Sequence, residues 1–144
     1  MASRAAPLLA VIKQEFYPFA KARGFERDKS INPLFKTFRR RTGTVDQVVE
    51  IQWDKYWRPC FVINFGRAAG DERIDYEGRL QRKRGGGRNC WFGTRRPWPG
   101  KLTTGKWSYT PEEVLSELVA AFDELETWWE QGVAGPHIDL WRDG

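Results

Sequence analysis

The sequence is poor in the residues that build cross-links and metal centres. It has two cysteines, Cys60 and Cys90, and one histidine, His137, among 144 residues. Two cysteines are too few for a disulfide scaffold, their spacing matches no zinc pattern, and one histidine argues against a histidine-based metal centre. We therefore expect two reduced, buried thiols, no metal site and no cofactor.

Long apolar runs are also missing. The apolar start of the chain, MASRAAPLLAVIKQEF, is broken by Lys13 and Gln14 and is too short for the core of a signal peptide. No later stretch approaches the length of a membrane span. The sequence therefore predicts a soluble, cytoplasmic protein without a membrane partner.

Carboxylates are absent from one long segment. Residues 79–106 contain nine basic and no acidic side chains, whereas residues 107–144 contain nine acidic side chains and one basic one; the whole chain has a net charge of +5. Either the acidic segment lies against the basic one and neutralises it, or the two face different ways and the basic one meets an anionic partner.

The composition is that of a folded protein. Hydrophobic residues make up 40% of the chain, which includes nine Phe and eight Trp. A chain of this length can bury a conventional core. We expect a single domain over residues 1–144.

Two segments have helical patterns. Apolar side chains recur every three or four residues in 4–23, where Pro18 predicts a kink near Tyr17 because it lacks an N–H. A second helix is predicted to begin after Thr110, with Pro111 in its first turn and Glu113 completing a capping box, and to end at Gly132.

Between these helices, three segments alternate as strands do: 34–41, 45–54 and 59–66, with a fourth predicted at 89–92. The order of elements predicts an α+β fold. It consists of a small antiparallel sheet of three to five strands, with an N-terminal and a C-terminal helix packed on one face.

Catalytic patterns are weak. GKLTTGKW (100–107) resembles a phosphate-binding loop, but Trp107 replaces the metal-binding Ser or Thr, and His137 has no evident nucleophile beside it. Glu50, Gln52 and Asp54 share one strand face. That pattern fits either a solvated face or a metal-dependent nuclease.

Binding residues are easier to nominate. RKRGGGRNCWFGTRRPW (82–98) combines six basic side chains with two tryptophans, and Trp57 lies beside Arg58 in a connection. Arginine and tryptophan are typical of protein interfaces, and the same residue types bind single-stranded nucleic acid. A mobile hairpin tip is the third interpretation of this stretch. The candidate partner-binding residues are Trp57, Arg58, Arg82, Lys83, Arg84, Arg88, Arg95, Arg96 and Trp98.

The central residues carry a resemblance. RGFERDKS (23–30), LFKTFRRR, VVEIQWDKY and FVINFG resemble the uncharacterised bacterial family catalogued as domain of unknown function forty-three-oh-four, over residues 8–66. Its members look like a helix, a "GF" turn, a strand ending in Arg, a "vQ" strand and an "INLG"-like strand. The family has no agreed activity, and the resemblance implies an immunity or accessory role based on tight binding.

Taken together, the sequence predicts a non-enzymatic protein that binds a protein partner. Nucleic-acid binding through residues 79–106 is the alternative, and a metal-dependent nuclease is the third hypothesis.

Overall fold

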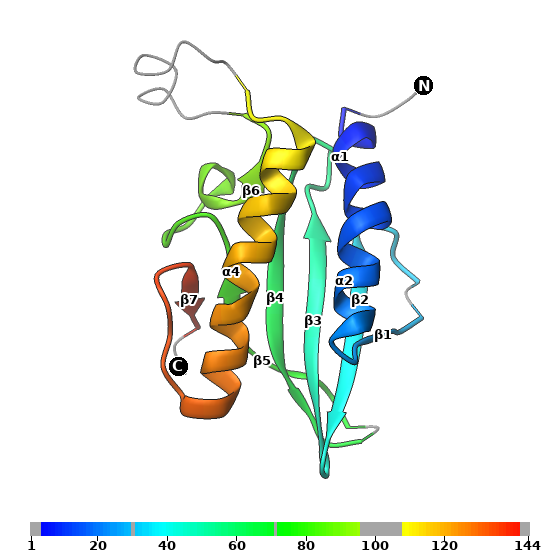
Figure 1. Cartoon of the computed structure of the whole chain (residues 1–144), viewed down its shortest axis with the longest axis vertical. Coiled ribbons are helices and arrows are strands. Elements are labelled where there is room, and N and C mark those ends of the chain that lie inside the picture. Colours follow the sequence, from blue (N-terminus) through cyan, green and yellow to red (C-terminus); the bar gives the residue numbers. More distant parts are fainter. Residues whose placement is uncertain (1–3, 30, 71, 96–107, 142–144) are drawn as a thin grey trace.

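The computed structural model describes residues 4–29, 31–70, 72–95 and 108–141. Two helical segments pack on a seven-stranded antiparallel sheet. In Figure 1 both helices lie in front of the sheet and cover the same face.

The N-terminal helical segment is continuous but irregular. It comprises α1 (Ala6–Val11), a π-helical turn η1 (Ile12–Phe16) and α2 (Tyr17–Ala22). The Tyr17 N–H donates to the carbonyl of Ile12, five residues back, directly before Pro18. Because Pro18 has no N–H to donate, a wider turn before it keeps the backbone bonded. The irregularity predicted near Tyr17 therefore takes the form of a π turn.

The sheet contains β1 (Glu26–Arg27), β2 (Phe35–Thr42), β3 (Val45–Trp53), β4 (Cys60–Ala68), β5 (Asp75–Leu80), β6 (Phe92–Gly93) and β7 (Ile138–Leu140). Their order is β1-β2-β3-β4-β5-β7, and β6 pairs with β4. Neighbouring strands are antiparallel throughout. The three long central strands are those that the alternating pattern predicted.

The predicted sheet of three to five strands is wrong, because the sheet has seven strands. The sequence pattern missed β1, β5 and β7. The broad α+β class remains, but strands contribute more to it than expected. The segment expected as a fourth strand at 89–92 is a short 3₁₀ turn, η2 (Arg88–Cys90), followed by the two-residue β6.

The C-terminal helix α4 (Pro111–Gln131) begins and ends where the sequence predicted. Thr110 accepts a hydrogen bond from the Glu113 N–H, and the Glu113 carboxylate accepts one from the Thr110 N–H, so the predicted capping box is confirmed. Gly132 ends the helix with φ of 69°, a left-handed conformation that suits glycine.

The core lies between the helices and one face of the sheet. Val49, Ile51 and Trp53 of β3 belong to it, together with Phe16 and Phe122 from the two helices. Val48 and Val62 are buried but lie outside this core cluster, because alternation points them to the opposite face. No α-helix among the described residues covers that opposite face (Figure 1). We call it the helix-free face.

Candidate functional site

The helix-free face contains a network of polar side chains centred on Glu50. Strand register brings Thr37 of β2 and Asn64 of β4 to either side of Glu50. Glu50 accepts hydrogen bonds from Thr37 Oγ1 (3.3 Å), Asn64 Nδ2 (3.0 Å) and the Tyr76 hydroxyl (2.8 Å). Burial, followed by the bond to Glu50, raises the pKa of the Tyr76 phenol well above its usual value.

Asn64 connects this network to an arginine of β5. Its amide nitrogen also donates to Gln52 Oε1 at 2.9 Å, and its amide oxygen accepts from Arg79 Nε at 3.0 Å. Arg79 Nη2 lies 3.4 Å from the same Gln52 oxygen. Gln52 of β3 and Asn64 of β4 are therefore in direct contact.

Arg79 lies between two tryptophans. Its guanidinium carbon is 5.9 Å from the centroid of a Trp91 ring and 5.7 Å from that of Trp141. Trp91 is buried and Trp141 is 45% exposed. Tyr76 packs against Trp141 with ring centroids 6.0 Å apart. Cation–π contacts of this kind hold a guanidinium in a fixed plane.

A buried carboxylate lies at the end of the same face. Asp54 has no exposed surface and accepts from Arg58 Nε at 3.1 Å, from Arg58 Nη2 at 3.2 Å, and from the backbone N–H of Tyr56 at 2.9 Å. Arg88 forms a further ion pair with it. Burial raises the pKa of Asp54, but these hydrogen bonds and the Arg88 charge outweigh it, so the pKa lies below its usual value.

These contacts join into one surface. Arg58 lies 5.3 Å from the Tyr56 ring centroid, and Arg88 lies 5.7 Å from Trp91, which also contacts Arg79. Arginines and aromatic rings thus lie side by side across the helix-free face, and Asp54 joins Arg58 to Arg88. We call this set the arginine–aromatic ladder; it consists of Tyr56, Arg58, Arg88, Trp91, Arg79, Trp141 and Tyr76.

The ladder unites two regions that the sequence nominated separately. Arg58 and Arg88 come from different connections, and both bind Asp54. Their side chains are 47% and 41% exposed. Lys55 adds another cation, 5.0 Å from the Tyr56 ring centroid, and Tyr56 is 69% exposed.

Other nominated arginines are engaged inside the protein. Arg82 binds Glu117 of α4 through two bonds of 2.5 and 2.7 Å and stacks on Tyr109. Arg84 donates to the carbonyl oxygens of Ile138 and Gly135, both at 2.9 Å. The basic segment therefore contacts the acidic helix at Arg82, and in its described part Arg79, Arg82, Arg84 and Arg88 already have acceptors.

Four more of the nominated residues fall into two groups. Lys83 and Arg95 are exposed. Arg96 and Trp98 lie outside the described residues. The near-match to a phosphate-binding loop at 100–107 lies outside them as well.

Trp57 is held more firmly than a surface aromatic would be. It is half-buried, packs 6.3 Å from Trp53 between ring centroids, and accepts a hydrogen bond from the Ala5 N–H through its carbonyl. Its φ of 56° is unusual for a residue other than glycine. These contacts fix the connection from which Tyr56 and Arg58 project.

Groups capable of catalysis have structural partners. The imidazole of His137 contacts Glu124, whose other oxygen accepts from the His137 N–H at 2.8 Å. Burial and the Asp54 charge raise the pKa of the Cys60 thiol to about 11, which keeps it protonated at neutral pH. Within the described residues, no group of three or more His, Cys, Asp and Glu side chains is placed to hold a metal ion.

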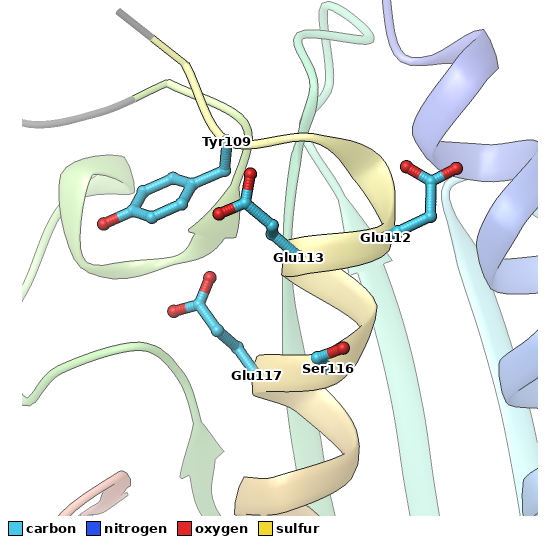
Figure 2. Close-up of a pocket in the computed structure, with 5 residues that line it drawn as sticks. All are labelled: Tyr109, Glu112, Glu113, Ser116 and Glu117. Carbon is cyan, nitrogen blue, oxygen red and sulfur yellow. The ribbon is translucent and has the colours of Figure 1, made fainter. Parts of the chain in front are cut away.

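A shallow pocket of about 350 Å³ lies beside the first turns of α4. Figure 2 shows Glu113 and Glu117 pointing toward Tyr109 there. Glu113 belongs to the capping box and Glu117 binds Arg82, so both carboxylates already have structural roles.

Comparisons with protein families, curated proteins and solved structures found no match. No helix among the described residues is both long and apolar enough to cross a membrane. The candidate site therefore rests on the geometry of this chain alone.

Sequence reasoning missed much of the ladder. Arg79 was counted in the basic segment but not nominated, because its strand β5 was not recognised. Tyr76 lies on the same unrecognised strand. Trp141 follows β7 directly, and only the pairing of β7 with β5 brings it beside Arg79 and Tyr76. Tyr76 and Arg79 are three residues apart, so simple alternation along a strand would place them on opposite faces. A bulge in the pairing of β4 with β5 shifts the register between them.

Proposed function

We propose that this is a cytoplasmic protein that acts by binding another protein, and that the arginine–aromatic ladder is its contact surface. The observation that carries the proposal is the stacking of three arginines on tyrosine and tryptophan rings across the helix-free face. These three residue types dominate the energetic centres of protein interfaces. An accessory or immunity role, which the resemblance implies, would require such a partner.

The ladder is organised before any partner arrives. Asp54 holds Arg58 and Arg88, while Asn64 and Gln52 hold Arg79. Fixing a long side chain on binding costs about 0.5–1.5 kcal/mol. Side chains that are already held lose less entropy, so this arrangement favours affinity.

Nucleic-acid binding through residues 79–106 receives less support from the geometry. Phosphate binding relies on several lysines and arginines that are free to replace counterions. Arg82 and Arg88 are instead paired with carboxylates, and Arg84 donates to carbonyl oxygens. A polyanion would have to compete with each of these contacts.

A metal-dependent nuclease also receives less support. Mg²⁺ binds carboxylates that have free oxygen lone pairs. Glu50 accepts three hydrogen bonds, and Asp54 is bound by two guanidiniums. Both carboxylates that the nuclease hypothesis needs are thus engaged by donors.

Site-specific photo-crosslinking tests the proposal. A benzophenone amino acid would replace Tyr56 in the ladder or, as a matched control, Ile31, which is fully exposed elsewhere. In nuclease-treated lysate of the source cells, we expect a discrete crosslinked protein from position 56 and none from position 31. The crosslink should disappear when Trp141→Ala is added.

Equal crosslinking from both positions, or a product that persists with Trp141→Ala, would refute the ladder as the contact surface. A product that is present only when the lysate is not treated with nuclease would favour the nucleic-acid alternative.

A further inference from the structure

Arg79 differs from four other arginines associated with the helix-free face. Each of those four lies within 4 Å of a carboxylate: Arg39 and Arg41 at Asp46, and Arg58 and Arg88 at Asp54. No such ion pair involves Arg79 within the described ranges, and its two hydrogen-bond acceptors are neutral amide oxygens.

Two carboxylates near Arg79 in the strand register accept hydrogen bonds from other donors. Asp139 of β7 is its register partner, but the Asp139 carboxylate accepts from the Gly85 N–H at 3.2 Å. Glu50 is linked to Arg79 through the Asn64 amide and accepts hydrogen bonds from Thr37, Asn64 and Tyr76. The guanidinium charge is therefore not balanced by direct contact.

The guanidinium is also fixed in orientation. Two of its donor atoms, Nε and Nη2, are directed to Asn64 and Gln52, and Trp91 and Trp141 flank it. A guanidinium has five N–H groups, so about three are left for a ligand. Partial burial of an unpaired charge is unfavourable, and an anionic ligand would remove that cost.

We propose that Arg79 is the anchor of the ladder and binds a carboxylate from an acidic segment of the partner. The proposal rests on the protein-binding function above and adds the chemistry of the partner. A planar carboxylate matches the two-pronged donor edge of a guanidinium. The exposed Trp141 and Tyr56 would flank the segment, and Lys55, Arg58 and Arg88 give this surface more positive charge than Asp54 offsets.

A carboxylate ligand is favoured over a nucleic-acid phosphate. Nucleic acids gain affinity from several phosphate contacts spread along the backbone. The ladder offers one unpaired guanidinium, and its other two arginines share Asp54. One well-held cation suits a single acidic side chain with apolar or aromatic neighbours.

The test uses fluorescence anisotropy with three labelled probes of equal length: a glutamate decamer, a glutamine decamer and an oligothymidylate. At low salt we expect the unchanged protein to bind the glutamate peptide and to bind the other two at least tenfold more weakly. Arg79→Gln should weaken binding of the glutamate peptide at least tenfold. Arg79→Lys keeps the charge but loses the two-pronged donor edge, so its affinity for the glutamate peptide should lie between those of the unchanged protein and Arg79→Gln.

Arg73→Gln is the matched control, because Arg73 is an exposed arginine outside the ladder, and it should change affinity less than twofold. Circular dichroism of each variant checks that the fold is retained. If Arg79→Gln does not fold, the comparison of Arg79→Lys with Arg73→Gln decides.

The outcomes separate this inference from the proposed function. Equal affinity of Arg79→Lys, Arg79→Gln and the unchanged protein, or no binding of the glutamate peptide, would overturn the inference while crosslinking from position 56 still tests the function. Tighter binding of the oligothymidylate would overturn it in favour of nucleic acid.

Discussion

Asp54 should be one of the most important polar residues for stability. It is a fully buried carboxylate on which two arginines and the Tyr56 backbone N–H converge. Removing one member of a buried ion pair costs about 3–5 kcal/mol when the remaining charge stays buried. Here the arginine side chains are 47% and 41% exposed, so both can regain water.

We therefore expect a cost below that range. Asp54→Asn removes the charge but keeps an oxygen for the backbone N–H groups of Tyr56 and Arg58, and it should lower the free energy of unfolding by about 2 kcal/mol. Asp54→Ala also leaves those N–H groups without their acceptor and should cost about 3 kcal/mol. Urea unfolding at pH 7 measures both values. Asp123→Asn is the matched control, because Asp123 is 70% exposed in its pair with Arg23, and should cost less than about 0.5 kcal/mol.

The pH dependence provides a second check. The pKa of Asp54 is lowered in the folded protein, so its contribution to stability is complete above the unfolded value of about 4 and is lost as the pH falls through the folded value. The difference in stability between the unchanged protein and Asp54→Asn should therefore shrink in acid. Equal losses for Asp54→Asn and Asp123→Asn, or a difference that does not change with acid, would refute this account of the ion-pair site.

Three further predictions concern the network, the helix cap and the sheet. Burial and Glu50 raise the pKa of Tyr76, so the contribution of the Tyr76 phenol to stability is complete below about pH 10 and is lost as the pH rises further. In a spectrophotometric titration, the Tyr76 phenolate of Glu50→Gln should therefore form at lower pH than that of the unchanged protein. Thr110→Ala removes the cap of α4 and should cost about 1 kcal/mol in thermal or urea unfolding, and no measurable loss would contradict the capping box. A Cβ at Gly66 would lie 2.1 Å from the Asp75 carbonyl oxygen, so Gly66→Ala should lower the free energy of unfolding by about 1–3 kcal/mol or more. A Cβ at Gly86 meets open space, so Gly86→Ala should change it by less than about 0.5 kcal/mol. Similar losses in both variants would refute the close approach at Gly66.

The sequence predicts the elements whose signals are local. Alternation over 45–54 and 59–66 located the long strands β3 and β4, and the Thr110 and Gly132 signals located α4. Strand β5 escaped because DYEGRL is polar and contains Gly78, which reduces strand propensity. That glycine is needed because a Cβ there would lie 2.6 Å from the Asp139 carbonyl oxygen of β7. This constraint arises only after the two strands have paired.

The candidate site was less accessible to prediction for the same reason. A run of basic residues indicates charge, but it does not indicate which guanidiniums have partners. Arg82 is engaged by a glutamate of α4, and Arg88 is engaged by Asp54 of the β3–β4 connection. Only tertiary structure separates these arginines from Arg79, which has neutral acceptors.

The lengths of the outermost strands also affect how this protein can associate. The sheet ends in β1, with two residues, and β7, with three, and the neighbouring β2 carries Lys36 and three consecutive arginines. Short, charged edges resist pairing with strands from other molecules, which protects a sheet against edge-to-edge aggregation. A partner that adds a strand would find little backbone to pair with at either edge. Any association through this sheet would therefore use side chains on its broad face, and the short edges limit growth of the sheet by strand pairing.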